Sequence, residues 1–406
     1  MECNQKTKFT EWENNKDIQI FRDYLKIPSV HPNVNYNECV EFLRNQADVL
    51  ELPSKVVEIN QGKPIVIITW LGTETEKKSI LLNSHMDVVP VYPEKWTYPP
   101  FSAHMDEQGR IYGRGSQDMK CVGIQFLGVI RALKHEGRKL KRTLHVIFVP
   151  DEEIGGVLGM KDFVQSNYFR ELNCGFAIDE GYASETDTFR LFYGERTLKP
   201  VHFTISGTPG HGSLLLPGTA GEKARKLIDK MMDFRQSEEQ RLEANNELTV
   251  GDVTTVNLTM MSGGVQSNVI PPEFKLCFDV RIAHNITIEE FERLVDAWCE
   301  ESGGGIKIDY GVYPFVESTK LDESNKYWVV FKQALQHMDL KVKPQILPGA
   351  TDIRYIRELG IPAIGFSPMN KTPVLMHDHD EYLHADIFLK GIGIYKNIIT
   401  AVANVK

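Results

Sequence analysis

The chain has 406 residues, of which 42% are hydrophobic and 25% are charged, and this is the composition of an ordinary globular protein. Because single hydrophobic cores stop growing at roughly 250 to 300 residues, we expect two domains. The formal net charge of -9, without long basic runs, argues against binding to nucleic acid or to an anionic membrane. Small molecules are therefore the expected partners.

Residues 1–17 are polar and lack the apolar core of a signal peptide. No segment approaches the ~18 consecutive apolar residues of a membrane span. The six cysteines form no CxxC pair, which favours reduced, structural thiols. We therefore expect a cytoplasmic protein without a membrane partner.

Short apolar runs alternate with segments of helical periodicity, and this pattern predicts an α/β domain with a largely parallel sheet. The clearest helix begins at about Lys120, directly after Asp118, and ends near His135, before Gly137. The predicted strands are Ile65–Trp70, Ile80–Asn83, Leu144–Val149, Phe176–Ile178 and, much later, Ala363–Phe366.

The pattern changes at about Glu195 and resumes after Pro314. Residues 195–313 predict the order strand, helix, strand, strand, helix, strand, which is the ferredoxin-like split βαβ sandwich. Thr287 and Glu290 fit a capping box at the start of the second helix. We therefore expect an α+β domain inserted into a discontinuous larger domain, 1–194 and 314–406. The elements expected after residue 195 are strands Val201–Ile205, Thr254–Met260, Phe274–Ile282 and Ile306–Val312 and helices 221–234, 287–300, 325–338 and 386–402.

Three consecutive acids, Asp151, Glu152 and Glu153, follow the apolar run that ends at Pro150. Carboxylates crowded at the end of a buried strand repel one another and resist burial, so the cluster indicates a site for cations. The alternative is a solvated acidic loop. The rest of the chain favours the metal site.

Four further segments place metal-binding side chains at strand ends or in nearby loops, where open α/β sheets form their sites. Nitrogen and oxygen donors without cysteine suit zinc, cobalt or manganese. One ligand from each of the five segments gives two histidines and three carboxylates, a charge that two divalent cations and a hydroxide balance. Here Asp179 and Glu180 remain alternatives. The four segments contain His85 with Asp87, Asp118, Asp179 with Glu180, and His377 to Glu381.

The segments SHMDVVPV, IYGRGSQDMKC, VPDEEIGG, AIDEG, GTPGHGS and HDHDEYLH resemble, in this order, the M20 metallopeptidase family. Within that family the chain is most similar to the aminoacylases, which are N-acyl-L-amino-acid amidohydrolases. The resemblance implies a zinc-hydrolase catalytic domain with an inserted domain that serves as a lid and joins a homodimer. It also implies hydrolysis of an N-acyl-L-amino acid to a carboxylate and a free amino acid.

The resemblance further implies a role for each matching residue. Glu152 would be the general base, and Asp87 would orient a histidine ligand without binding metal itself. Two zinc ions per subunit are implied, with cobalt or manganese as alternatives, and the family pattern favours Glu180 over Asp179. One ion would be held by His85, Asp118 and Glu180, and the other by Asp118, Glu153 and His377.

Substrate contacts are implied for residues outside the metal site. His211 in the GTPGHGS turn would reach across a dimer and stabilise the oxyanion. Asn268 and Arg281 would contact the substrate's carboxylate or its reacting carbonyl, and Arg354 is a second carboxylate candidate. The alternatives are an M20 dipeptidase or carboxypeptidase, a hydrolase of long-chain fatty-acyl amino acids and, from another class, a non-catalytic metal-binding protein.

Overall fold

The computed structural model describes residues 2–311 and 314–406, with side chains from residue 7 onward. The chain forms two compact units. The larger comprises Met1–Tyr193, Glu317–Pro344 and Thr351–Lys406, and the smaller comprises Gly194–Val316 and Gln345–Ala350. The segment 195–313 therefore lies within the smaller unit, which also takes in residues 345–350.

The main sheet has eight strands in the order β1-β2-β5-β3-β6-β16-β7-β15. The four central strands, β5, β3, β6 and β16, pair in parallel. Strands β1, β2 and β7 pair antiparallel at the sides. This confirms the predicted mixed α/β fold with a mostly parallel central sheet. The strands are β1 Ser54–Glu58, β2 Pro64–Trp70, β3 Ser79–His85, β5 Leu144–Val149, β6 Cys174–Asp179, β7 Phe189–Glu195, β15 Val342–Leu347 and β16 Ala363–Phe366.

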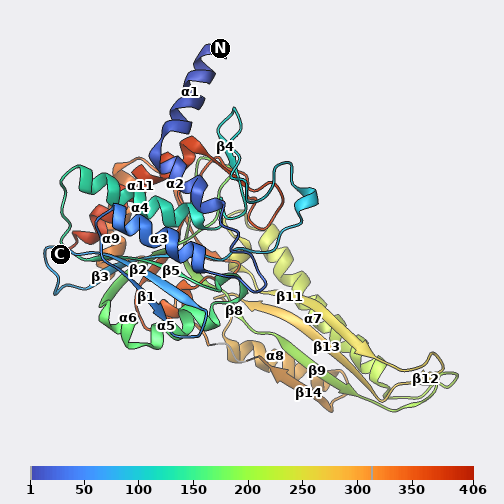
Figure 1. Ribbon diagram of the computed structural model, residues 1–406. Coiled ribbons are helices and arrows are strands. Elements are labelled where there is room, and N and C mark those ends of the chain that lie inside the picture. Colours follow the sequence, from blue (N-terminus) through green and yellow to red (C-terminus); the bar gives the residue numbers. More distant parts are fainter. Residues whose placement is uncertain (1, 312–313) are drawn as a thin grey trace. The chain divides into compact units, whose positions relative to one another are not determined.

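Helices cover both faces of this sheet, as the positions of α4 and α5 in Figure 1 show. Along β5, Val146 and Phe148 belong to one hydrophobic core and Ile147 and Val149 to the other, because successive side chains of a strand point to opposite faces. The first face carries α2 Lys16–Leu25, α3 Asn37–Val49, α4 Lys120–His135, α9 Lys326–His337 and α11 Ala385–Ala403; the second carries α5 Asp162–Gln165, α6 Asn167–Glu171 and α10 Ile353–Glu358.

Three helices near the N-terminus, α1 (Glu2–Asn14), α2 and α3, were not predicted. Helix α2 buries Ile18, Phe21 and Leu25 among its apolar residues, so its helical spacing was a usable signal. Strand β3 continues two residues beyond the predicted Asn83. His85 is therefore the last residue of a buried central strand.

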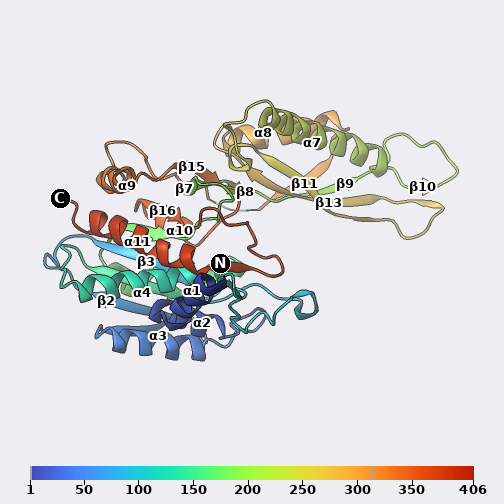
Figure 2. The ribbon, with the colours of Figure 1, turned by 90° about the horizontal axis from the view of Figure 1, so that it is seen from above.

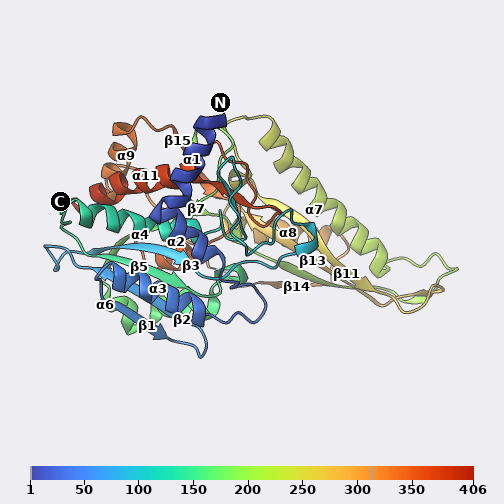
Figure 3. The same cartoon turned by 45° about the horizontal axis from the view of Figure 1, so that its top comes forward.

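The smaller unit contains a sheet in the order β11-β13-β9-β14, with all pairs antiparallel. Helices α7 and α8 lie on one face of it (Figure 2), and α7 runs along β11 and β13 (Figure 3). The chain order and the Thr287–Glu290 capping box are as predicted. Helix α7 is longer than expected, and the expected strand end at Val312 lies outside the described residues. The elements are β9 Val201–Ser206, α7 Ala220–Glu243, β11 Thr255–Gly263, β13 Glu273–Ile282, α8 Ile288–Glu301 and β14 Ile306–Tyr310.

Short strands complete the description. In the larger unit β4 (Arg110–Tyr112) pairs with β17 (Tyr382–His384), and in the smaller unit β10 (Gly210–His211) pairs with β12 (Val269–Ile270). The five cysteines whose side chains are described are buried and form no disulfide. Within 2–311 and 314–406, every helix is too short or too polar to cross a bilayer.

Candidate metal centre

Candidate metal-binding side chains lie together at one edge of the larger unit's sheet. His85 ends β3, the acidic turn follows β5, and Glu180 follows β6. These three strands are parallel neighbours, so their carboxyl ends meet at the same edge. Ligand atoms of His85, Glu152 and Glu180 lie within 4.8 Å of one another, and so do those of His85, Asp118 and Glu153.

The imidazole of His85 is fully buried and has a defined orientation. Its Nδ1 lies 2.8 Å from the backbone carbonyl oxygen of Asp87. Because a carbonyl oxygen only accepts hydrogen bonds, Nδ1 carries a proton and donates it, and Nε2 is the nitrogen turned toward the carboxylates. Nε2 faces Asp118 Oδ1 at 3.0 Å and Glu180 Oε1 at 3.7 Å. A neutral imidazole with a free Nε2 is the form that binds a metal ion.

Asp118 lies between the two histidines and uses a different oxygen for each. Oδ1 is the atom near His85, whereas Oδ2 lies 3.2 Å from Nε2 of His377. The same His377 nitrogen lies 3.1 Å from Glu153 Oε2. Asp118 therefore joins a buried half of the centre, with His85, to a half that opens to solvent, where the side chain of His377 is 55% exposed.

The loop that carries Asp118 is held by the carboxylate of Glu381, which is fully buried. One oxygen accepts the backbone N–H of Gln117 at 2.6 Å and that of Asp118 at 3.3 Å. The other accepts the Arg114 guanidinium at 2.7 Å and the N–H of Gly115 at 3.2 Å. Glu381 is thus a structural anchor close in sequence to His377.

The acids of the centre are crowded enough to change their protonation. Burial, together with the charge of Asp118, raises the pKa of Glu153 and that of Glu180. Burial opposes ionisation of Asp118, but hydrogen bonds from His377 and His85 outweigh it and hold its pKa far below the usual range. Glu153 Oε1 and Glu180 Oε2 are buried without a hydrogen-bond partner. Carboxylate oxygens left without donors, beside two imidazoles, fit divalent cations.

Asp179 and Glu180 point to different surroundings. Oδ1 of Asp179 accepts a hydrogen bond from Asn83 at 3.0 Å, within the sheet. Glu180 instead joins His85 in the cluster of ligand atoms. The geometry thus favours Glu180 as the ligand.

The acidic turn is fixed by residues from earlier in the chain. Asp151 has a positive φ of 64° and its carboxylate accepts hydrogen bonds from Tyr36 at 2.7 Å and from Lys63 at 2.8 Å. Gly156 closes the turn with a φ of 62°, and a Cβ there would lie 2.0 Å from Oδ1 of Asp352. Asp151 therefore positions the turn.

Asp87 contacts His85 through its backbone carbonyl and not through a hydrogen bond of its carboxylate. Its carboxylate lies 3.9 Å from the His85 ring nitrogen, and the backbone carbonyl of Asp87 orients the ring instead. The carboxylate accepts the N–H groups of Glu152 at 3.2 Å and Glu153 at 3.0 Å, and it lies 2.8 Å from Nε2 of His31. Asp87 thus holds the His85 ring through its backbone carbonyl, while its carboxylate is engaged by the acidic turn.

Arg354 belongs to the larger unit and is engaged by the acidic turn. Its guanidinium donates to the carbonyl of Gly155 at 2.8 Å and contacts the Tyr355 hydroxyl at 2.9 Å.

The other proposed substrate residues lie in the smaller unit. His211 is exposed on β10, its Nδ1 2.8 Å from the Ser213 hydroxyl. The carbonyl of Asn268 accepts the N–H of Gly212, so Asn268 and His211 are neighbours. Arg281 forms a bidentate pair with Asp279 at 3.0 and 3.2 Å.

The model of peptidase family M20/M25/M40 matches residues 81–401, which include every proposed ligand. The chain belongs to this family. It is 46% identical to Aminoacylase-1A of Rattus norvegicus, with 98% of each chain covered. It is also 46% identical to Aminoacylase-1 of Homo sapiens, with 97% of each covered, and 44% identical to Aminoacylase-1 of Dictyostelium discoideum, with 97% of this chain and 99% of that one covered.

Solved structures of M20 proteins share the fold. A metallo-carboxypeptidase of Sulfolobus solfataricus has a TM-score of 0.70 at 18% identity, with 96% of this chain and 99% of that one covered. The YXEP protein of Bacillus subtilis, described as a dinuclear metal-binding peptidase of family M20, has a TM-score of 0.67 at 16% identity, with 98% and 99% covered. These identities support the fold and no finer conclusion.

Several residues that position this M20 site were missed in the sequence. Glu381 was read only as the end of the HDHDE segment, and His31 and Tyr36 were not singled out at all. No local motif marks the last two, since each contacts the centre through an acid more than fifty residues away. The only usable signal was Glu381 itself, an acid within an otherwise metal-binding motif.

Proposed function

We propose that this protein is a dizinc aminoacylase, which hydrolyses the amide bond of N-acyl-L-amino acids to a carboxylate and a free L-amino acid. The observation that carries the proposal is the presence of all five ligand candidates and Glu152 at one sheet edge of a chain 46% identical to Aminoacylase-1A over 98% of both lengths. A non-catalytic relative would be expected to lack a ligand or the base.

The donor set supports two zinc ions, with cobalt or manganese as alternatives. His85, Asp118 and Glu180 would hold one ion, and Asp118, Glu153 and His377 would hold the other. The separate use of the two Asp118 oxygens by the two histidines supports a bridging role for that carboxylate. When bound, the ions would supply a water of lowered pKa and polarise the scissile carbonyl.

Glu152 is the general base in this proposal. Burial raises the pKa of its carboxyl well above the ordinary range, with the charge of Glu180 adding to the effect. Such a carboxyl can hold a proton between two steps at neutral pH. Glu152 would take a proton from the attacking water as the C–O bond forms, and return it to the amide nitrogen as the C–N bond breaks.

The substrate's carboxylate requires a cationic partner, for which Arg281 and Arg354 are the candidates. The guanidinium of Arg281 is 30% exposed in its pair with Asp279, so it remains accessible to an anionic ligand. Asn268 would contact the substrate, and the neighbouring His211 would donate a hydrogen bond to the oxyanion.

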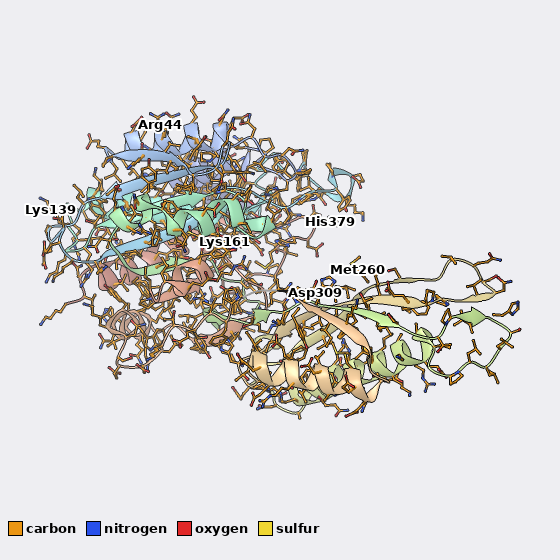
Figure 4. All side chains as sticks on the ribbon, turned by 90° about the horizontal axis from the view of Figure 1, so that it is seen from below. Arg44, Lys139, Lys161, Met260, Asp309 and His379 are labelled. Carbon is orange, nitrogen blue, oxygen red and sulfur yellow. The ribbon has the colours of Figure 1, made fainter. Side chains whose placement is uncertain are left out.

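We also propose a cytoplasmic homodimer joined through the smaller unit. Strand β11 lies at the edge of its sheet and exposes Leu258, Met260 and Met261, of which Met260 is 67% exposed (Figure 4). An exposed apolar edge strand is the kind of surface that a second copy covers. In such a dimer, His211 of the partner subunit would supply the hydrogen bond to the oxyanion.

A parallel assay of N-acetyl-methionine, N-lauroyl-glutamine and a dipeptide tests the proposal, with metal content measured on the same preparation. The aminoacylase proposal requires the highest kcat/KM on N-acetyl-methionine. Preference for the lauroyl substrate would indicate a fatty-acyl amino acid hydrolase, and preference for the dipeptide would refute the proposal. Bound metal with no hydrolysis would indicate a binding protein.

A further inference from the structure

The carboxylate of Asp87 is fully buried, and it connects the start of the chain to the acidic turn. Oδ1 accepts the N–H of Glu152, and Oδ2 accepts that of Glu153 and lies 2.8 Å from Nε2 of His31. An ionised carboxylate only accepts hydrogen bonds, so Nε2 of His31 carries a proton and donates it. The Asp87 carboxylate, which accepts the N–H groups of Glu152 and Glu153, thus has a third donor in His31, 56 residues earlier in the chain.

Backbone hydrogen bonds hold His31 next to Asp87. The N–H of Val88 donates to the carbonyl of Ser29 at 2.9 Å, and the N–H of His31 donates to the carbonyl of Val88 at 3.1 Å. The Ser29 hydroxyl adds a bond to the carbonyl of Met86 at 2.5 Å. The His31 side chain is only 9% exposed, so water has little access to its place. The His31 ring is therefore held against Asp87 by the backbone pairing of residues 29–31 with Val88, as well as by its own rotamer.

We propose that His31 is a positioning residue for hydrolysis: its ring N–H fixes the Asp87 carboxylate in the orientation that holds the backbone of Glu152 and Glu153. This inference rests on the proposed function, because Glu152 acts as the base there.

The need for the third donor follows from the alternatives open to Asp87. Without His31, Oδ2 keeps only the N–H of Glu153, and a buried carboxylate with too few donors reorients toward another. One such donor is the Nδ1–H of His85, which lies 3.9 Å from Oδ1 and bonds to the backbone carbonyl of Asp87. Such a rotation of the Asp87 carboxylate would release the acidic turn and would also tilt the His85 ring. The charged groups that face His31 are Asp87, Asp151 and Lys63.

Three substitutions separate the hydrogen bond from the volume of the ring. His31→Phe keeps a ring without a donor, His31→Ala removes both, and His31→Gln keeps a donor at a similar distance from the backbone. We expect kcat on N-acetyl-methionine to fall about 10- to 100-fold in the Phe and Ala variants, with KM unchanged and metal bound more weakly, because the effect falls on the geometry of the base and of its neighbouring ligand Glu153. His31→Gln should stay within about threefold of the wild type. His145→Gln, a buried histidine in β5, is the matched control and should leave kcat unchanged.

Hydrogen exchange supplies a readout that does not depend on activity. The amides of Glu152 and Glu153 should exchange about tenfold faster or more in His31→Phe and His31→Ala than in the wild type and His31→Gln. Normal kcat and normal exchange in His31→Phe would overturn the inference, and so would a loss confined to His31→Ala, which would indicate packing. If the wild type hydrolyses no N-acyl amino acid, the proposed function fails, while the exchange rates still decide whether His31 holds the turn.

Discussion

Arg114 and Glu381 form a buried ion pair at 2.7 Å between segments 267 residues apart. The Arg114 side chain is 2% exposed and Glu381 is fully buried. The carboxylate also accepts three backbone N–H groups of the loop that ends at Asp118. The proposed bridging ligand is thus placed by a residue only four positions after His377, the ligand candidate on the solvent side.

Replacing Glu381 by Gln should destabilise the fold and weaken metal binding. Arg114 would remain as an unpaired buried charge, and breaking a buried pair from one side costs about 3 to 5 kcal/mol. Chemical denaturation measures the loss, and a metal titration should show weaker binding because the Asp118 loop is released. Glu107→Gln, at an exposed acid in the same unit, is the control and should change neither quantity. Unchanged stability in Glu381→Gln would show that the pair contributes nothing.

Replacing Glu152 by Gln should nearly abolish turnover and leave the metal content intact. Loss of a general base typically costs about 10²- to 10⁴-fold in rate, and Glu152 is not among the proposed ligands. Elemental analysis and kcat on N-acetyl-methionine measure the two effects. The neighbouring Glu153→Gln should instead lose metal. Loss of metal in Glu152→Gln would contradict a pure acid–base role.

The strand ends and the ligand types were predictable from the sequence because both depend on local pattern. A buried run followed by acids, as at Val149 and Asp151, indicates a sheet edge with a site, and five such segments indicate a shared one. Local pattern could not decide whether Asp179 or Glu180 faces the site, because consecutive residues point to opposite sides of a strand end. Only the register of β6 against β3 shows that Glu180 faces His85.

The side chains that position the ligands could not be predicted in the same way. Asp87 lies next to His85 in a two-residue spacing, yet its carboxylate bonds to a turn more than sixty residues later. Such partners are selected by tertiary packing, which single-sequence pattern does not contain.

Mixing two inactive variants should restore activity if His211 acts across the proposed dimer. In a mixed dimer of His211→Ala and Glu152→Gln subunits, one site has an intact base and receives an intact His211 from its partner. Random reassociation of equal amounts should recover about one quarter of wild-type activity in a two-fold dimer. The assay is turnover of N-acetyl-methionine after subunit exchange. The control is each variant taken alone through the same exchange procedure. If the mixture recovers no turnover, His211 acts in the site of its own chain.

His145 should make the fold sensitive to mild acid. It lies in β5 with its Nδ1 2.9 Å from the Thr69 hydroxyl, and burial lowers the pKa of its imidazole from 6.5 to about 4. Between these values the unfolded chain binds a proton that the folded chain does not. The free energy of unfolding should therefore fall as the pH drops from 6.5 to about 4, by about 3 kcal/mol from this residue, and the contribution should be fully present above pH 6.5.

Urea denaturation of the wild type and His145→Gln across that pH range measures this contribution. Glutamine does not titrate and can accept the Thr69 hydroxyl, so the difference between the two proteins isolates the proton of His145. The wild type should lose more stability than the variant between pH 6.5 and about 4, with no change in their difference at higher pH. Parallel curves throughout would mean that the imidazole is protonated in the folded state as readily as in the unfolded chain, which its burial beside Thr69 argues against.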